Sequence, residues 1–148
     1  MNPQNGYDVE DLGVGMSAGI AKTITEADIL MFSAVSTDTN AVHLDEEYGK
    51  TTMFGGRIAH GMLSASLISA VLGTRLPGPG VIYMSQSLRF KAPVRIGDTV
   101  HATVTVKEVI VEKSRVVLDT VCSVGGKAVI EGEAMVMATS RARREAAK

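Results

Sequence analysis

The sequence predicts an α+β domain in which an antiparallel sheet of about five strands wraps around a long central apolar helix. Residues 61–74 form an apolar run without a charged residue, which is typical of a buried helix. Several segments after residue 80 alternate apolar and polar residues, as strands do. Two of them are separated by Gly125-Gly126, which favours a β-hairpin. A sheet packed on one helix is an α+β arrangement.

Length and composition indicate one globular domain over residues 1–148. The chain has 148 residues, of which 45% are hydrophobic, and its net charge of -1 does not suggest nucleic-acid binding. Cys122 is the single cysteine, which excludes an internal disulfide and fits a reducing compartment. Residues 1–12 are polar and acidic, unlike a signal peptide, and no segment is apolar over a membrane-spanning length. We therefore expect a cytoplasmic protein with no membrane contact.

The N-terminal third predicts a strand followed by a helix. Residues 1–12 are expected to be a loose lead-in, and residues 18–24 a strand. The sequence Thr25-Glu26-Ala27-Asp28 is typical of a helix capping box. Apolar residues at a spacing of three should turn one face of the helix to the core: Ile29, Phe32 and Val35, with Met31 beside them. This helix should end before residue 38.

The next stretch, residues 38–43, combines a carboxylate, an amide and an imidazole. Asp and Asn favour a turn over a continuing helix. A turn would let Asp38 and His43 reach the same small molecule. An acid and a base that share one water need such an arrangement. The alternative is that Asp38 and Asn40 only form the turn and that His43 lies at the surface. Residues 45–49 are expected to form a short solvated helix that a glycine ends.

Residues 61–74 should form a helix that is buried on nearly all sides. Small residues along it would allow other backbone to approach closely: Gly61, Ser64, Ala65, Ser66, Ser69, Ala70 and Gly73. The helix is too short to span a bilayer. Prolines and glycines in residues 76–80 end it.

The rest of the chain predicts four antiparallel strands. Their expected ranges are residues 81–90, 99–112, 116–124 and 128–139, with a turn at residues 91–98. In the second of them, valines and an alanine alternate with polar residues and should face the core: Val100, Ala102, Val104 and Val106. Residues 140–148 are expected to be a charged tail. Because such a sheet leaves an open edge and a half-covered face, we expect a homodimer.

Taken together, these stretches resemble the MaoC-like hotdog-fold hydratases, and among them the (R)-specific enoyl-CoA hydratases. Residues 38–45 resemble the family's Asp-x-Asn-Pro-x-His motif, and residues 57–67 resemble the start of its central helix. Residues 72–80 and 86–94 are also similar to family stretches. One departure is Ala41, which stands where the motif has a proline that would pre-set the turn.

The resemblance implies reversible addition of water to a trans-2-enoyl-CoA, which gives an (R)-3-hydroxyacyl-CoA. It implies that Asp38 and His43 are the catalytic residues. It also implies that the Gly61 amide forms the oxyanion hole, that Ser69 lies near the pair and that Asn40 belongs to the site. The chemistry assigns Asp38 as base and His43 as acid, although the two roles could be exchanged or shared through one water. The expected partner is an acyl-CoA thioester.

No metal or cofactor is expected. The three histidines are far apart in the sequence, and no glycine-rich phosphate loop is present. His60 is predicted to be structural, bonded to backbone at a helix start, and His101 to be solvated. The phosphates of coenzyme A could meet one or more of five basic residues, among which the sequence does not choose: Arg57, Arg75, Arg89, Lys91 and Arg95.

Three other functions stay open from the sequence alone. A 3-hydroxyacyl-[acyl-carrier-protein] dehydratase could use the same acid–base pair. A hotdog thioesterase often carries a carboxylate on the central helix, whereas residues 61–74 contain none. A non-catalytic binding or scaffold subunit would not need Asp38 and His43. Ser69 could likewise only bond back to its own helix.

Overall fold

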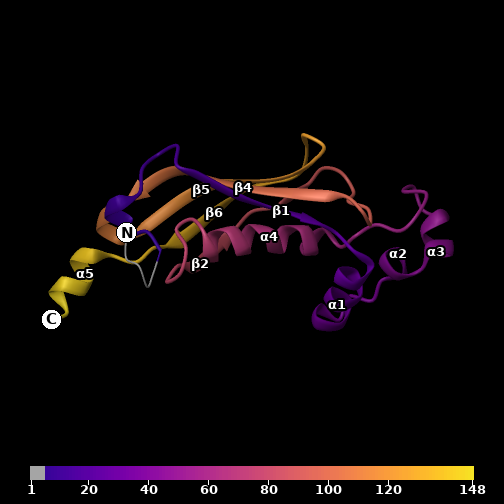
Figure 1. Ribbon diagram of the computed structural model, residues 1–148, viewed down its shortest axis with the longest axis horizontal. Helices are drawn as coiled ribbons and strands as arrows, with labels where there is room; N and C mark the ends of the chain where they lie inside the picture. Colours follow the sequence, from indigo (N-terminus) through magenta and orange to yellow (C-terminus); the bar gives the residue numbers. More distant parts are fainter. Residues whose placement is uncertain (1–5) are drawn as a thin grey trace.

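The computed structural model describes residues 6–148, so residues 1–5 of the expected lead-in lie outside the described residues. A six-stranded sheet covers one side of a central helix (Figure 1). The strands are β1 (Ser17–Thr23), β2 (Ile82–Gln86), β3 (Arg89–Phe90), β4 (Thr99–Ile110), β5 (Arg115–Val124) and β6 (Lys127–Met137). They pair antiparallel in the order β1-β4-β5-β6-β2, and β3 also pairs with β6. The α+β prediction is confirmed, with one strand more than expected.

In the described part of the chain, five α-helices accompany the sheet. They are α1 (Glu26–Ser36), α2 (Ala41–Leu44), α3 (Glu46–Lys50), α4 (Gly61–Thr74) and α5 (Arg141–Ala146), with short 3-10 helices at η1 (Val9–Asp11) and η2 (Val111–Lys113). The bounds of α4 are the predicted ones. None of the helices within residues 6–148 has both the length and the hydrophobicity that a membrane span requires.

The core lies between α4 and the sheet. Helix α4 packs on β4, β5 and β1, and its buried side chains include Leu67, Ile68 and Val71. The predicted alternation in β4 is confirmed, since its four inward residues are buried: Val100, Ala102, Val104 and Val106. The expectation that α4 is buried on nearly all sides was wrong. Met62, Ser66 and Ser69 lie on an exposed stripe, because the sheet covers only one side of the helix.

Helix α1 begins as predicted, and Ile29 and Phe32 pack on the core as expected, but Val35 and Met31 do not. The Thr25 capping box is present. Ile29 is buried, whereas Val35 is 85% exposed and Met31 is 60% exposed. At 3.6 residues per turn, a residue six positions on lies roughly 120° around the helix, whereas a residue four positions on lies roughly 40° away. The buried residue one turn after Ile29 is accordingly Ser33.

Two predicted elements differ from the prediction in more than their end residues. The strand expected over residues 81–90 is split into β2 and β3, and its pairing with β6 shifts register between Tyr83 and Ser85. Gly49 does not end α3 but lies buried inside it. A Cβ at Gly49 would lie 2.6 Å from the backbone of Gly56, so the glycine permits this close approach.

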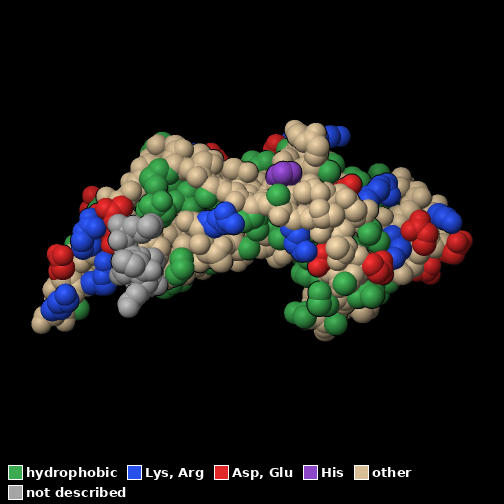
Figure 2. All heavy atoms as spheres, in the orientation of Figure 1, with side chains coloured by type: hydrophobic (Ala, Val, Ile, Leu, Met, Phe, Trp, Pro, Cys, Tyr) green, Lys and Arg blue, Asp and Glu red, His purple; other side chains and the backbone are tan. Residues whose placement is uncertain are grey.

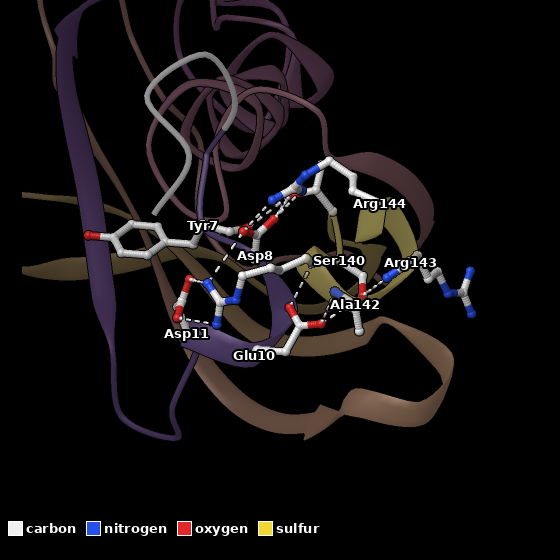
Figure 3. Close-up of polar contacts among 10 residues, drawn as sticks. Tyr7, Asp8, Glu10, Asp11, Ser140, Ala142, Arg143 and Arg144 are labelled. Carbon is white, nitrogen blue, oxygen red and sulfur yellow. Dashed lines mark hydrogen bonds and ion pairs between the residues drawn. The ribbon is translucent and has the colours of Figure 1, made fainter. Parts of the chain in front are cut away.

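The N-terminal segment was expected to be loose, but residues 6–12 are anchored to the C-terminal tail. The Asp8 side chain is buried and accepts two hydrogen bonds from the Arg144 guanidinium, at 2.6 and 2.8 Å. Glu10 accepts a hydrogen bond of 2.7 Å from the Ser140 hydroxyl, and backbone N–H groups at the start of α5 donate to the same carboxylate (Figure 3). Complementary charges far apart in sequence therefore join the two ends of the chain.

Replacing Asp8 with asparagine should lower the free energy of unfolding at pH 7 by about 1.5–3 kcal/mol, the usual contribution of a hydrogen bond to a charged group. The Arg144 guanidinium holds the pKa of Asp8 down at about 2, below its ordinary value of 3.8. A lowered pKa stabilises the fold at pH values above 3.8, and this stabilisation disappears as the pH falls towards about 2.

Urea unfolding checks this prediction. The free energies of unfolding of the wild type and of Asp8→Asn should differ at pH 7 and become equal in acid. Asp11→Asn is the matched control. Asp11 pairs with Arg141 at a distance of 3.2 Å but lies nearer the surface, so this substitution should lower the free energy of unfolding less. Equal stability of wild type and Asp8→Asn at pH 7 would show that the buried pair does not stabilise the fold.

Candidate active site

The stretch from Asp38 to His43 forms the expected turn. The Asp38 carboxylate accepts a hydrogen bond from the backbone N–H of Asn40 at 3.2 Å. The Asn40 side chain then caps α2 by accepting from the N–H of Val42 at 3.2 Å. Ala41 is the first residue of α2, a helix position at which proline is also tolerated. The turn therefore forms without the motif proline, and the side chain of Asn40 serves it as a cap.

The two predicted catalytic side chains lie together. His43 Nε2 is 3.9 Å from Asp38 Oδ2. The carbonyl of Ile58 lies 2.8 Å from His43 Nδ1. Because a carbonyl can only accept, Nδ1 carries the hydrogen and Nε2 faces the carboxylate with its lone pair.

The surroundings keep the His43 ring neutral. Burial lowers the pKa of His43 below its ordinary value of 6.5, although the hydrogen bond to Ile58 and the Asp38 carboxylate act in the opposite direction. The Asp38 side chain, by contrast, is 51% exposed. Two acceptors 3.9 Å apart, one buried and one open to solvent, can each accept one hydrogen from a single water molecule.

A second histidine, His60, lies against this pair. Its ring is stacked on that of His43 with centroids 3.9 Å apart. Its Nε2 lies 2.9 Å from the Asp38 carbonyl, which agrees with the predicted bond to backbone. Ligand atoms of Asp38, His43 and His60 lie within 4.8 Å of one another, a spacing that a metal ion could also bridge. The absence of a metal stays a prediction from the sequence.

A cavity of about 510 Å³ begins beside the pair. Asp38, His60 and Gly61 line one part of it, while Phe90 and residues 92–94 form an apolar wall. Gly61 is the first residue of α4, where backbone N–H groups have no partner within the helix and the helix dipole is positive. A Cβ at Gly61 would lie 2.6 Å from the Phe90 ring, so glycine lets this ring cover the helix start. No pattern in the sequence indicated that Phe90 lies against Gly61.

Ser69 does not line this cavity. It lies two turns after Gly61 on the exposed stripe of α4, in a separate cleft of about 480 Å³ bordered by Phe32, Met62 and strand β2. Within one chain, the structure therefore brings Asp38, His43 and Gly61 together and places Ser69 in the neighbouring cleft.

Ser69→Ala should slow turnover less than any change to Asp38 or His43. Alanine has a high helix propensity and Ser69 is exposed, so the melting temperature should match that of the wild type. Steady-state rates and thermal unfolding of the variant check both expectations. A loss as large as that of the Asp38 and His43 variants would place Ser69 in the reacting site.

The five candidate basic residues differ in their surroundings. Arg57 forms two hydrogen bonds to Glu26, at 2.7 and 2.9 Å, and donates a third to the His43 carbonyl at 2.7 Å. Arg57 therefore anchors α2 and, with it, His43. Lys91 lines the cavity and is exposed at its edge, 3.2 Å from the carboxylate of Glu131. Of the five, Lys91 is the residue best placed to meet an anionic substrate.

Comparison with known proteins gives a consistent result. Residues 11–128 match the family described as MaoC like domain. The chain is 63% identical over 132 residues to the (R)-specific enoyl-CoA hydratase of Rhodospirillum rubrum, covering 89% of this chain and 92% of that protein. It is 52% identical over 127 residues to the 3-hydroxybutyryl-CoA dehydratase of Methylorubrum extorquens, covering 86% and 81%. The structure of an unliganded R-hydratase from Pseudomonas aeruginosa superposes with a TM-score of 0.87 at 46% identity, covering 93% and 88%.

Proposed function

The chain belongs to the MaoC-like domain family, and from this we propose that it is a hotdog-fold (R)-specific enoyl-CoA hydratase. It adds water reversibly to a trans-2-enoyl-CoA and gives an (R)-3-hydroxyacyl-CoA. The observation that carries the proposal is the Asp38–His43 pair, 3.9 Å apart, beside the cavity at the start of α4. An acid–base pair next to a helix N-terminus is the chemistry that hydration of a thioester requires.

In the proposed reaction, one water donates its hydrogens to Asp38 Oδ2 and His43 Nε2. As the water oxygen bonds to C3 of the substrate, its proton passes to the carboxylate of Asp38. The proton moves on to Nε2 of His43, which delivers it to C2, and the pair returns to its starting state. Hydrogen bonds of this kind are often long in free enzymes and shorten when substrate binds. The neutral ring of His43 supports this order, because the ring must receive a proton before it can act as the acid.

Negative charge develops on the thioester oxygen while C3 is attacked. We place this oxygen at the N–H of Gly61, where the partial positive charge of α4 favours an anion. Gly61 has no side chain to keep the thioester away from the backbone. The Phe90 ring lies where a Cβ of residue 61 would be, which supports a site in which water is excluded from one side of the oxyanion.

The product of crotonyl-CoA hydration tests this function. We expect 3-hydroxybutyryl-CoA of the (R) configuration in chiral chromatography. The (S) isomer would contradict the proposal. A series of enoyl-CoAs from short to long, compared with the corresponding carrier-protein thioesters, distinguishes the two acyl carriers. A preference for carrier-protein thioesters would indicate the dehydratase, release of free coenzyme A would indicate a thioesterase, and inactivity on every thioester would indicate a binding subunit.

A homodimer is also part of the proposal. Strand β2 is a sheet edge, and its residues Ile82, Tyr83 and Met84 are exposed. Apolar side chains also gather on α1, where Leu30, Met31 and Val35 are exposed; Figure 2 shows such a gathering in the region of this helix. Open edges and apolar faces of this kind pair with a second copy. We expect a dimer in which the two sheets are joined at their edges. Sedimentation should give the mass of a dimer, and a stable monomer at micromolar concentration would contradict this expectation. The cytoplasmic location stays a prediction from the sequence.

A further inference from the structure

Three groups of the proposed mechanism come from three separate elements, and one residue contacts them all. Asp38 lies in the loop after α1, His43 on α2, and Gly61 at the start of α4. His60 bonds to the first, stacks on the second and directly precedes the third. We propose that His60 is a positioning residue that holds the Asp38 carboxylate and the His43 ring in register with the start of α4. This inference rests on the proposed function.

The hydrogen bond from His60 fixes the loop that carries Asp38. Within residues 6–148, the other hydrogen bonds of Asp38 are local, since its N–H donates to Ser36 and its carboxylate accepts from Asn40. His60 Nε2, 2.9 Å from the Asp38 carbonyl, is therefore the one hydrogen-bonded tie between Asp38 and a distant part of the described chain. Without this tie, the exposed carboxylate has only neighbours in its own loop to set its position.

The same imidazole connects this loop with α1 and α2. Ser33, buried on α1, has its hydroxyl 3.1 Å from His60 Nε2. The ring of Phe32 also packs on His60, with centroids 4.8 Å apart. The His60 ring also stacks on that of His43, at an interplanar angle of 29°. The His43 ring is thus held in its plane by this stack, and a turn that moved Nε2 away from Asp38 would lose the hydrogen bond to the Ile58 carbonyl.

The hydrogen positions of His60 follow from its partners. The Asp38 carbonyl only accepts, so His60 Nε2 carries the hydrogen and Nδ1 has a lone pair. Nδ1 is buried and has no hydrogen-bond partner within residues 6–148. The tie to Asp38 thus requires the hydrogen of His60 on Nε2.

A pair of substitutions tests the position of that donor. In His60→Gln the amide nitrogen can take the place of Nε2 and still donate to the Asp38 carbonyl. In His60→Asn the amide reaches only the place of Nδ1, and the tie is lost. Because small misplacements of reacting groups can lower rates up to about 10²-fold, we expect kcat of His60→Asn to fall at least about tenfold while KM stays within about twofold. His60→Gln should recover a substantial part of this loss.

Combination with Asp38→Asn distinguishes positioning from simple stability. If His60 acts through the Asp38–His43 pair, His60→Asn should lower kcat much less in the Asp38→Asn background than in the wild type. A full, multiplicative loss in the double variant would contradict the proposal, as would wild-type kcat in His60→Asn. Should His60→Asn fail to fold by circular dichroism, the comparison of His60→Gln with the wild type, alone and in the Asp38→Asn background, decides instead.

A readout without substrate separates this inference from the proposed function. Nitrogen NMR of the imidazole rings reports which nitrogen carries the hydrogen. In the wild type we expect His43 with its hydrogen fixed on Nδ1 and His60 with its hydrogen on Nε2. In His60→Asn the signals of His43 should show a mixture of both forms. An unchanged His43 signal would overturn the positioning role even if the enzyme is active, whereas an inactive wild type with the expected signals would overturn only the hydratase.

Discussion

Asp38→Asn is expected to fold like the wild type and to hydrate crotonyl-CoA at least about 10²-fold more slowly, since a positioned general base is worth roughly 10²–10⁴-fold. The change is nearly isosteric, and asparagine favours turns as aspartate does. Its side-chain oxygen can still accept the hydrogen bond from Asn40 that shapes the turn. The variant therefore removes the proton acceptor and leaves the local structure in place.

A neighbouring aspartate supplies the matched control. Asp45 caps α3 by accepting from the N–H groups of Glu47 and Tyr48, and asparagine is an equally good cap. Asp45→Asn should retain wild-type turnover. Circular dichroism confirms the fold of both variants. If folded Asp38→Asn keeps more than about a tenth of wild-type turnover, the carboxylate is a turn former and is not the base.

His43→Asn should be similarly slow, with a loss of roughly 10²–10⁴-fold. The asparagine amide can take the place of Nδ1 and donate to the Ile58 carbonyl, so the anchor of α2 remains. What disappears is Nε2, the atom that faces Asp38. The matched control is His101→Asn, because His101 is exposed on β4 and should not affect turnover.

The pH profile of the wild type gives a second test of His43. Burial lowers its pKa, so the neutral ring persists below the ordinary value of 6.5. Since the proposed cycle starts from the neutral ring, kcat/KM should be retained at pH 6.5 and fall only at lower pH. Activity that is lost as the pH falls from 7.5 through 6.5 would contradict a neutral, buried His43. In the variant His43→Asn, turnover that is retained by the folded protein would likewise show that His43 has no part in the mechanism.

The elements that the sequence predicted best are those set by local pattern. Helix α4 has the predicted bounds because prolines and glycines directly follow an uncharged helical run and end it. The alternation of β4 was right because one of its faces lies on the core. In α1, by contrast, a spacing of three residues pointed to Val35, whereas the 3.6-residue period buries Ser33.

Contacts between distant segments could not be read in the same way. The carboxylate of Asp8 gave no sign of its partner Arg144, because charges 136 positions apart carry no periodic pattern. In the site, the motif spacing indicated Asp38 and His43. The hydrogen bond of Asn40 to α2 and the contact of Gly61 with Phe90 depend on the folded chain. His60 was predicted to be structural, and only the structure shows that it contacts both members of the pair.

One water held jointly by Asp38 and His43 is the centre of the proposed mechanism, and a double-mutant cycle tests it most directly. Crotonyl-CoA hydration is measured for the wild type, Asp38→Asn, His43→Asn and the double variant, all confirmed as folded. Residues that act as a unit are strongly non-additive, so the double variant should be no more than about tenfold slower than the slower single variant. If the two losses multiply instead, to roughly 10⁴-fold or more, the residues act independently and do not share one water.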